Sequence, residues 1–213
     1  MHGRRLLPLS GVAFVVLILL PIVVIAPDTP DSGASGAELA RFYDGEGTRQ
    51  YVATSVLVAS VPFLVLFAAS LAQALPSRLG VSTIWERMLV AGSVLAAGAV
   101  LLTATAHMGL VSGTEDGFSH GALEALNAVD GNTWIALNGG LGVMLLGAAG
   151  LLLGRSDGYR WAGRTALVLG VVLFVPYATF FAMMLTGIWV FVMGIAVARS
   201  RTALPHATAP GAA

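Results

Sequence analysis

Two polar side chains, His107 and Asn138, lie inside long apolar runs of this chain, and since no Asp, Glu, Arg or Lys lies deep in these runs, His107 is the ionisable group to consider there. An ionisable group kept in such a run points to transport, proton movement or ligand binding, because burying a charge in an apolar medium is costly. His107 lies about one helical turn from the end of one run, and Asn138 lies at a comparable depth in the next. The simpler interpretation is a hydrogen bond between two packed helices, and the alternative is a proton-sensitive or ligand-binding pocket.

A second pair of candidate residues, His120 and Glu124, lies between these two runs. The residues are four apart, so one face of a helix could carry both, and further acids nearby would permit a metal or cation site. However, the chain contains no HExxH motif or comparable ligand spacing. We therefore interpret both as solvated loop residues and expect no metal, no cofactor and no catalytic residue.

The composition excludes several other kinds of chemistry. The chain has no Cys, so it contains no disulfide, thiolate nucleophile or sulfur metal ligand. Nothing in it resembles a phosphate-binding loop, a nucleophile elbow or a pair of intramembrane aspartates. Its arginines occur in short scattered groups rather than on one concentrated surface, which argues against nucleic-acid binding.

The chain as a whole, whose helices must position these side chains, is unusually apolar. Of the 213 residues, 57% are hydrophobic and only 10% are charged, and the mean hydropathy is +0.86. Soluble domains are about half apolar and a quarter charged. The sequence therefore predicts an all-α, polytopic membrane helical bundle whose main contact is with the lipid bilayer.

Charged residues alternate along the chain, and this pattern predicts an orientation. All eleven basic residues are Arg, and nine of them fall in every second gap between apolar runs, whereas nine of the eleven acids fall in the other gaps. Basic flanks resist translocation across a bilayer. We therefore expect a multi-pass protein of a bacterial cytoplasmic membrane with both termini in the cytoplasm.

A bilayer core about 30 Å thick requires roughly 20 apolar helical residues per crossing. The predicted membrane domain is residues 1–201, with six spans at about 6–26, 51–75, 88–111, 133–153, 162–177 and 180–198. The last apolar stretch is too long for one crossing, and Pro176 is placed where it could fold back; one long tilted helix, giving five spans, is the alternative. Residues 202–213 are rich in Ala, Pro and Thr and are predicted to form a disordered cytoplasmic tail.

Two predicted outer segments carry signals for short surface helices. Ser35 and Glu38 form a capping-box pattern before Leu39, Phe42 and Tyr43, which share one helical face. Ser119 is a candidate N-cap for a second helix, with Leu123, Leu126 and Val129 at helical spacing. We expect both helices to lie on the outer surface.

Small residues recur at spacings of three and four in the third and fourth spans. Such stripes let two helix backbones approach closely in lipid. We expect these two spans to pack tightly within one chain; a homodimer through Gly150 and Gly154 is the alternative. The stripes comprise Gly92, Ala96, Ala99, Thr103 and Ala106 in one span and Ala136, Gly140, Gly147, Gly150 and Gly154 in the other.

Several short segments of the chain form a recognisable set. They are Gly-Val-Ala-Phe in the first span, Ala-Glu-Leu-Ala-Arg-Phe-Tyr before the second, Ala-Leu-Asn-Ala-Val-Asp before the fourth, and Trp-Ala-Gly-Arg at the start of the fifth, with a further Trp in the sixth. With these segments the chain resembles a group of uncharacterised multi-span membrane proteins that is common in actinobacteria. The resemblance implies a membrane protein of high-GC bacteria and brings no assigned activity.

Three functions remain open from the sequence. The preferred hypothesis is a structural or accessory helical bundle without enzymatic activity, acting with a membrane-protein partner or as a homodimer. The second is a small transporter or outer-facing sensor with a pocket near His107 and Asn138. The third is a membrane-embedded enzyme that modifies lipid.

Overall fold

The chain folds into a bundle of helices. The computed structural model describes residues 6–26, 29–75, 82–154 and 158–202, and these residues contain no β-strand. The predicted tail at 202–213 lies outside the described residues, except for Thr202, which ends the last helix. The elements are η1 (Leu7–Leu9), α2 (Ser10–Leu20), η2 (Pro21–Ile25), α3 (Gly36–Ala74), α4 (Ser82–Glu115), α5 (His120–Asn132), α6 (Trp134–Leu153), α7 (Arg160–Val172) and α8 (Thr179–Thr202).

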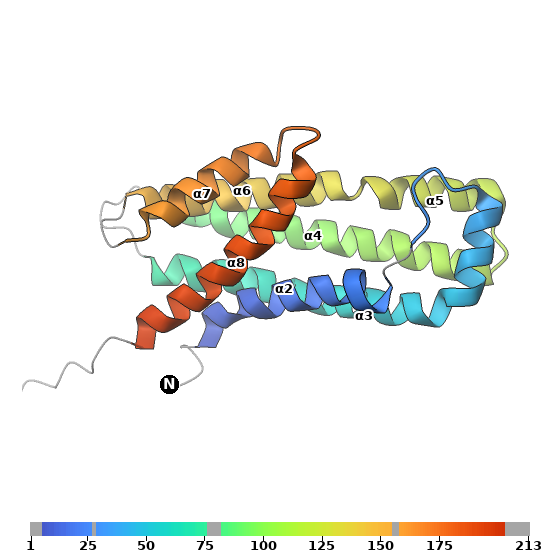
Figure 1. Cartoon of the computed structure of the whole chain (residues 1–213), viewed down its shortest axis with the longest axis horizontal. Helices are drawn as coiled ribbons and strands as arrows, with labels where there is room; N and C mark the ends of the chain where they lie inside the picture. The colour runs from blue at the N-terminus through green and yellow to red at the C-terminus, as the bar shows by residue number, and fades with distance from the viewer. Residues whose placement is uncertain (1–5, 27–28, 76–81, 155–157, 203–213) are drawn as a thin grey trace, which may run out of the picture.

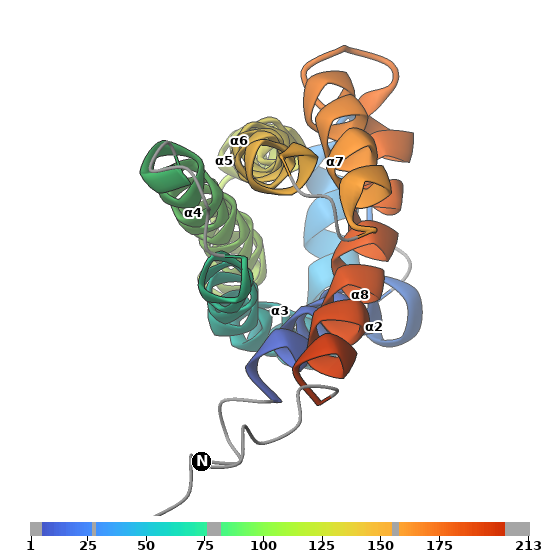
Figure 2. The same ribbon diagram turned by 90° about the vertical axis from the view of Figure 1, so that its left-hand side faces the viewer.

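The long helices run side by side along the molecule (Figure 1). The α4 helix packs between α3 and α6, α2 lies along α3, and α7 lies along α6. Figure 2 shows α8 on the side of α2 and α7, facing the layer formed by α3, α4 and α6. One apolar core joins these helices, with Phe67, Leu145 and Met193 among its fully buried side chains.

Five helical segments in the described part of the chain are long and apolar enough to cross a membrane. They are Leu7–Ile25, Gly36–Ala74, Ile84–Glu115, His120–Leu153 and Thr179–Ser200. This agrees with the predicted all-α membrane bundle. The α7 helix is not among them, because its 13 residues rise only about 20 Å, less than the bilayer core.

The last apolar stretch does fold back on itself, as its Pro176 suggested. Helix α7 ends at Val172, and α8 begins at Thr179 after a turn in which Tyr177 adopts a positive φ of 69°. The alternative of one long tilted helix is therefore wrong. The predicted fifth span, 162–177, is also too long, because the chain leaves the helix before Pro176, which disfavours helical geometry in the preceding residue.

The first predicted surface helix is not a separate element. The capping box is present, with the Ser35 N–H donating to Glu38 Oε2 at 2.9 Å, but the helix that it begins continues for 39 residues to Ala74. No proline lies between Ser35 and Pro62, and the helix continues through Pro62 as well. In Figure 1 the first turns of α3 lie across the end of the bundle, and the rest runs along it.

Close packing of the third and fourth predicted spans is confirmed in the α4 and α6 helices. A Cβ atom added to Gly92, Gly140 or Gly147 would overlap the backbone of the opposite helix. The stripe on α6 is shorter than predicted, because Ala136 is exposed and a Cβ on Gly154 would meet nothing within 4 Å. Gly150 packs under the ring of Trp85 on α4, so it is used within one chain.

Candidate functional site

The acidic ends of α3 and α4 and the whole of α5 form a cap at one end of the bundle. We define this acidic cap as residues 29–51 and 109–132. Its apolar centre consists of buried Leu39, Tyr43, Leu110, Val111 and Leu123. Ser119 caps α5 as predicted, because its Oγ accepts from the Ala122 N–H at 3.3 Å. Val129, by contrast, is 51% exposed and does not share the buried face of α5.

Glu124 connects the starts of α3 and α5 through a hydrogen bond, and His120 lies beside this contact. The Gly36 N–H donates to Glu124 Oε1 at 2.7 Å, so this carboxylate satisfies a free amide at the start of α3. A Cβ on Gly36 would overlap the backbone of His120, which shows how closely the two helix starts approach. Within the described residues, no group of three or more His, Cys, Asp and Glu side chains lies close enough to hold a metal ion.

His107 is the centre of a partly buried polar cluster that joins three helices. Its Nε2 lies 2.8 Å from Gln50 Oε1 on α3, and its Nδ1 lies 3.2 Å from Asp130 Oδ2 on α5. The ring also meets Tyr43 edge to face, with the ring centroids 5.6 Å apart. Which ring nitrogen donates depends on the tautomer, because the Gln50 amide can present either its oxygen or its NH₂ group. The cluster thereby fixes α3, α4 and α5 relative to one another.

The predicted hydrogen bond between His107 and Asn138 is wrong. Both ring nitrogens contact other residues, and the buried Asn138 Oδ1 has no hydrogen-bond partner. The antiparallel register of α4 and α6 explains the difference. Gly140 lies against Ala96; His107 is eleven residues beyond Ala96, and eleven residues before Gly140 is Val129, next to Asp130. The register therefore brings Asp130, and not Asn138, to the level of His107.

Gln50 and Asp130 are the functional candidates that the sequence did not single out as partners of His107. Gln50 directly precedes the second apolar run and is 1% exposed in the structure. A buried amide at the start of an apolar run is the signal that could have indicated it, because buried polar groups need partners. Asp130 lay among many acids in its segment, and only the helix register distinguishes it from them.

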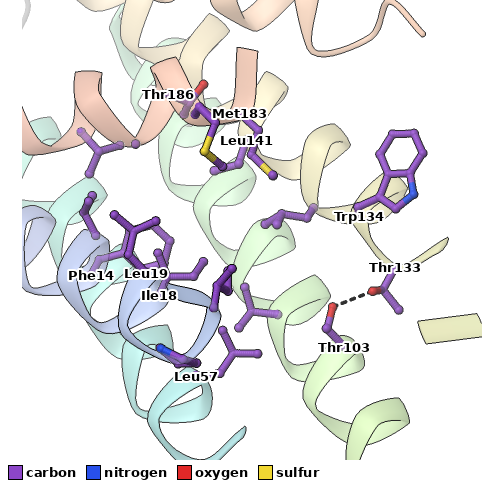
Figure 3. Close-up of a pocket in the computed structure, with 18 of the residues that line it drawn as sticks. Phe14, Ile18, Leu19, Leu57, Thr103, Thr133, Trp134, Leu141, Met183 and Thr186 are labelled. Atoms are coloured by element: carbon purple, nitrogen blue, oxygen red, sulfur yellow. Dashed lines mark hydrogen bonds between the residues drawn. The ribbon is translucent and has the colours of Figure 1, made fainter. Parts of the chain in front are cut away.

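A cavity of about 590 Å³ opens beside this cluster among six α-helices, α2 to α6 and α8. Pockets of this size, between roughly 300 and 1,000 Å³, are typical of sites for small organic ligands. Figure 3 shows the cavity between Phe14 and Ile18 of α2, Met183 and Thr186 of α8, and Leu141 of α6. The other lining residues are Val15, Leu19, Pro21, Ile22, Leu57, Val100, Thr103, Asp130, Thr133, Trp134, Leu137, Met184, Gly187, Ile188, Val190 and Phe191.

Polar groups line only a small part of this cavity. Thr103 Oγ1 donates to Thr133 Oγ1 at 2.7 Å, and Thr133 Oγ1 in turn donates to the Asp130 backbone oxygen at 2.7 Å (Figure 3). Asp130 connects the cavity with the polar cluster, because it lines the cavity and contacts His107 through Oδ2. Its second carboxylate oxygen, Oδ1, is buried without a hydrogen-bond partner.

The arrangement is suited to binding rather than to covalent chemistry. A histidine paired with an aspartate can activate a nucleophile, but the ring nitrogens of His107 contact Gln50 and Asp130 rather than a Ser or Thr hydroxyl. The three Thr hydroxyls that line the cavity donate to other oxygens of the protein. The cavity is therefore mostly apolar, with one carboxylate residue, Asp130, among the residues that line it.

Comparison with known proteins gives no relative from which a site could be transferred. No family model matches the chain, and no curated protein or solved structure does either. The functional argument therefore depends on the cavity and the polar cluster themselves. The resemblance to actinobacterial membrane proteins stays a prediction.

Proposed function

We propose that this chain is a non-enzymatic, multi-pass protein of a bacterial cytoplasmic membrane that binds a lipophilic molecule in the cavity between α2, α4, α6 and α8. The observation that carries the proposal is the cavity of about 590 Å³, whose lining residues are mostly apolar. Side chains that line an empty apolar cavity lack dispersion contacts on the cavity side, and a bound apolar ligand supplies those contacts. Water is a poor occupant, because it needs two to four polar partners.

The proposed orientation places the acidic cap outside the cell and both termini in the cytoplasm. The arginines of α7 lie near its start, at Arg160 and Arg164, and Arg199 lies near the end of α8. In Figure 1 these two helix ends and the start of α2 lie at the same end of the molecule, opposite the acidic cap. This segregation supports a cytoplasmic arginine end. In this topology α7 and α8 form a membrane hairpin that returns to its starting side, which gives the six membrane segments.

Lipophile binding agrees best with an accessory or sensing role. A membrane enzyme acting on lipid would need a nucleophile, a metal or a free acid–base group facing the substrate. Asp130 is the only ionisable residue among the cavity-lining residues named in the described part of the chain, and one of its oxygens contacts His107.

Photolabelling in vesicles tests the proposal directly in a membrane. A dodecanol analogue carrying a diazirine should label Met183 and Met184 of α8 in a saturable way, and excess dodecanol should suppress that labelling. Val94 and Leu95 on α4 are exposed and do not line the cavity, so they should label in proportion to the probe without suppression. Uniform labelling that dodecanol does not suppress would show that the cavity holds no ligand.

A further inference from the structure

We infer that the cavity takes up an acyl chain of a bilayer phospholipid, which enters sideways through a mouth between α2 and α8 while its head group stays in the bilayer. This inference rests on the proposed function, because it names the ligand of the same cavity and its route. The juxtaposition that carries it is an apolar cavity whose deep lining is buried and whose rim is exposed on α2, α6 and α8.

The residues that line the cavity divide into a buried and an exposed group. Phe14, Leu141 and Val190 are at most 5% exposed. Five others are between 38% and 60% exposed, and we define them as the mouth of the cavity: Leu19, Ile22, Trp134, Met184 and Ile188. Trp134 begins α6 just after α5 of the acidic cap, and Ile22 lies in η2, near the end of the first helical segment. The mouth is therefore at the acidic-cap end of the cavity.

Helices α2 and α8 diverge toward this mouth. At the other end they cross closely, because a Cβ atom added to Gly194 of α8 would lie 2.8 Å from the Pro8 backbone oxygen. From that crossing α8 runs obliquely away from α2 (Figure 1). The two helices therefore leave a gap on the side of the bundle, where a membrane protein meets lipid.

The two sides of the gap are bonded to different neighbours. Arg49 Nε of α3 donates to the Ile25 backbone oxygen at the end of η2. Trp189 Nε1 of α8 donates to the Ala162 backbone oxygen of α7 at 3.0 Å. These bonds hold η2 against α3 and α8 against α7, so the fold itself keeps α2 and α8 apart at the mouth.

The depth of the cavity fits one half of a bilayer. The lining extends along α6 from Trp134 to Leu141 and along α8 from Met183 to Phe191, which is roughly 10–12 Å at the rise of an α-helix. Half of the hydrocarbon core is about 15 Å thick. A phospholipid with its head group at the level of the interfacial Trp134 points its chains in the direction in which the cavity deepens. A chain can therefore enter without the lipid turning over.

The polar groups of the lining leave the head group outside. The hydroxyls of Thr103, Thr133 and Thr186 each donate to an oxygen of the protein. The Asp130 carboxylate is closed off as well, because Oδ2 lies against His107 and Oδ1 is buried. A phospholipid head group would lose its hydration in the cavity without gaining comparable hydrogen bonds, whereas an acyl chain gains dispersion contacts there.

A phospholipid with a diazirine at the end of one acyl chain tests the inference in vesicles that contain the full chain. The carbene formed on illumination should label Leu141 of α6 and Val190 of α8, which are buried and line the cavity. Leu145 and Val197 lie on the same two helices and are also buried, but they do not line the cavity, so they should stay unlabelled. Labelling of the two lining residues no stronger than that of these controls would overturn the inference.

Variants at the mouth test the route. Ile22→Trp combined with Ile188→Trp places two bulky rings at exposed positions of the mouth and should reduce phospholipid labelling of the deep lining to the level of the controls. Val23→Trp combined with Leu185→Trp makes the same change at neighbouring exposed residues that do not line the cavity, and should keep the parental labelling. Parental labelling in the folded mouth variant would contradict entry between α2 and α8.

Failure of this inference and failure of the proposed function give different results. If the phospholipid does not label the lining but the dodecanol analogue labels Met183 and Met184 in a suppressible way, the cavity binds a free lipophile and the phospholipid assignment is overturned. If neither probe labels the lining, the proposed function is overturned as well.

Discussion

His107 has a structural role that is visible in its contacts. It bonds Gln50 of α3 and Asp130 of α5 from its own position on α4, and it packs against Tyr43. The residue therefore secures the acidic cap to the membrane helices and also holds Asp130 beside the cavity.

The first prediction concerns the cost of removing this support. His107→Leu should lower the free energy of unfolding by about 1–3 kcal/mol, because it leaves Gln50 and Asp130 without a partner. His107→Gln should cost less, since an amide can keep one of the two bonds. Thermal unfolding in detergent measures both variants. Thr105→Val is the control, because Thr105 is exposed and bonds only its own helix, at Leu101 O; equal melting of His107→Leu and the control would contradict the role.

The sequence singled out His107 but not the partners that the structure gives it. Its isolation within an apolar run is a local property that can be read from the chain. Its partners depend on which residues of α3 and α5 lie at its level, and this is set by the register of packed helices. Asn138 had a similar sequence depth, but sequence depth alone does not say which residue faces His107.

At the level of helices, contact between α4 and α6 is the main packing device. Backbone meets backbone at Gly92, Gly140 and Gly147, where a side chain has no room. Without a hydrophobic effect between helices in lipid, such close contact supplies dispersion energy directly. It also fixes the register that brings Asp130 to His107.

The second prediction uses two glycines of α6 with opposite surroundings. A Cβ on Gly147 would overlap the backbone of Leu89, whereas a Cβ on Gly139 would meet nothing within 4 Å. Gly147→Ala should therefore destabilise the protein by about 1–3 kcal/mol through overpacking. Gly139→Ala should stabilise it by about 0.5–1 kcal/mol through better helix propensity. Thermal melting in detergent compares the two, and an equal effect of both changes would show that the stripe does not pack.

Element boundaries were predictable where local signals determine them. The capping box at Ser35 and the N-cap at Ser119 both begin helices as predicted. The length of α3 was not predictable in this way. Its first turns are polar and the rest is apolar, so the sequence suggested two separate segments, whereas the structure has one continuous helix. The early end of α7 likewise follows from the turn near Pro176 rather than from hydropathy, which stays high through that region.

At the scale of the whole molecule, the cavity forms only when the helices pack together. Its walls come from helices that are far apart in the sequence, from Phe14 of α2 to Phe191 of α8. Each of these residues alone looks like an ordinary apolar residue of a membrane helix. No periodicity in the chain distinguishes a face that lines a chamber from a face that packs or meets lipid, so the sequence predicted the bundle but not the site.

Helix α8 lines one side of this cavity. Large apolar side chains around the turn between α7 and α8 are exposed: Phe174 is 54% exposed, Phe181 near the start of α8 is 70% exposed, and Tyr177 is fully exposed. Exposed apolar side chains of this size and number are more stable in contact with lipid than with water. The hairpin thus agrees with a membrane location of the chamber and with entry of a ligand from the bilayer.

The measurement that tests the central claim most directly is lipophile binding to a protein whose cavity has been filled. Gly187 of α8 lines the cavity, and a Cβ added there would meet nothing within 4 Å, so Gly187→Phe places a ring in open space. Gly98→Phe makes the same change at an exposed position of α4 that also has open space and does not line the cavity.

Titration of both variants and the parent in vesicles with an environment-sensitive fluorescent alkyl probe gives the comparison. Gly187→Phe should weaken probe binding by at least about tenfold, because a ligand that loses roughly 1.4 kcal/mol of contacts loses a factor of ten in affinity. Gly98→Phe should bind as the parent does, and both variants should melt near the parent temperature. Unchanged binding to a well-folded Gly187→Phe protein would contradict the proposal that this cavity is the binding site.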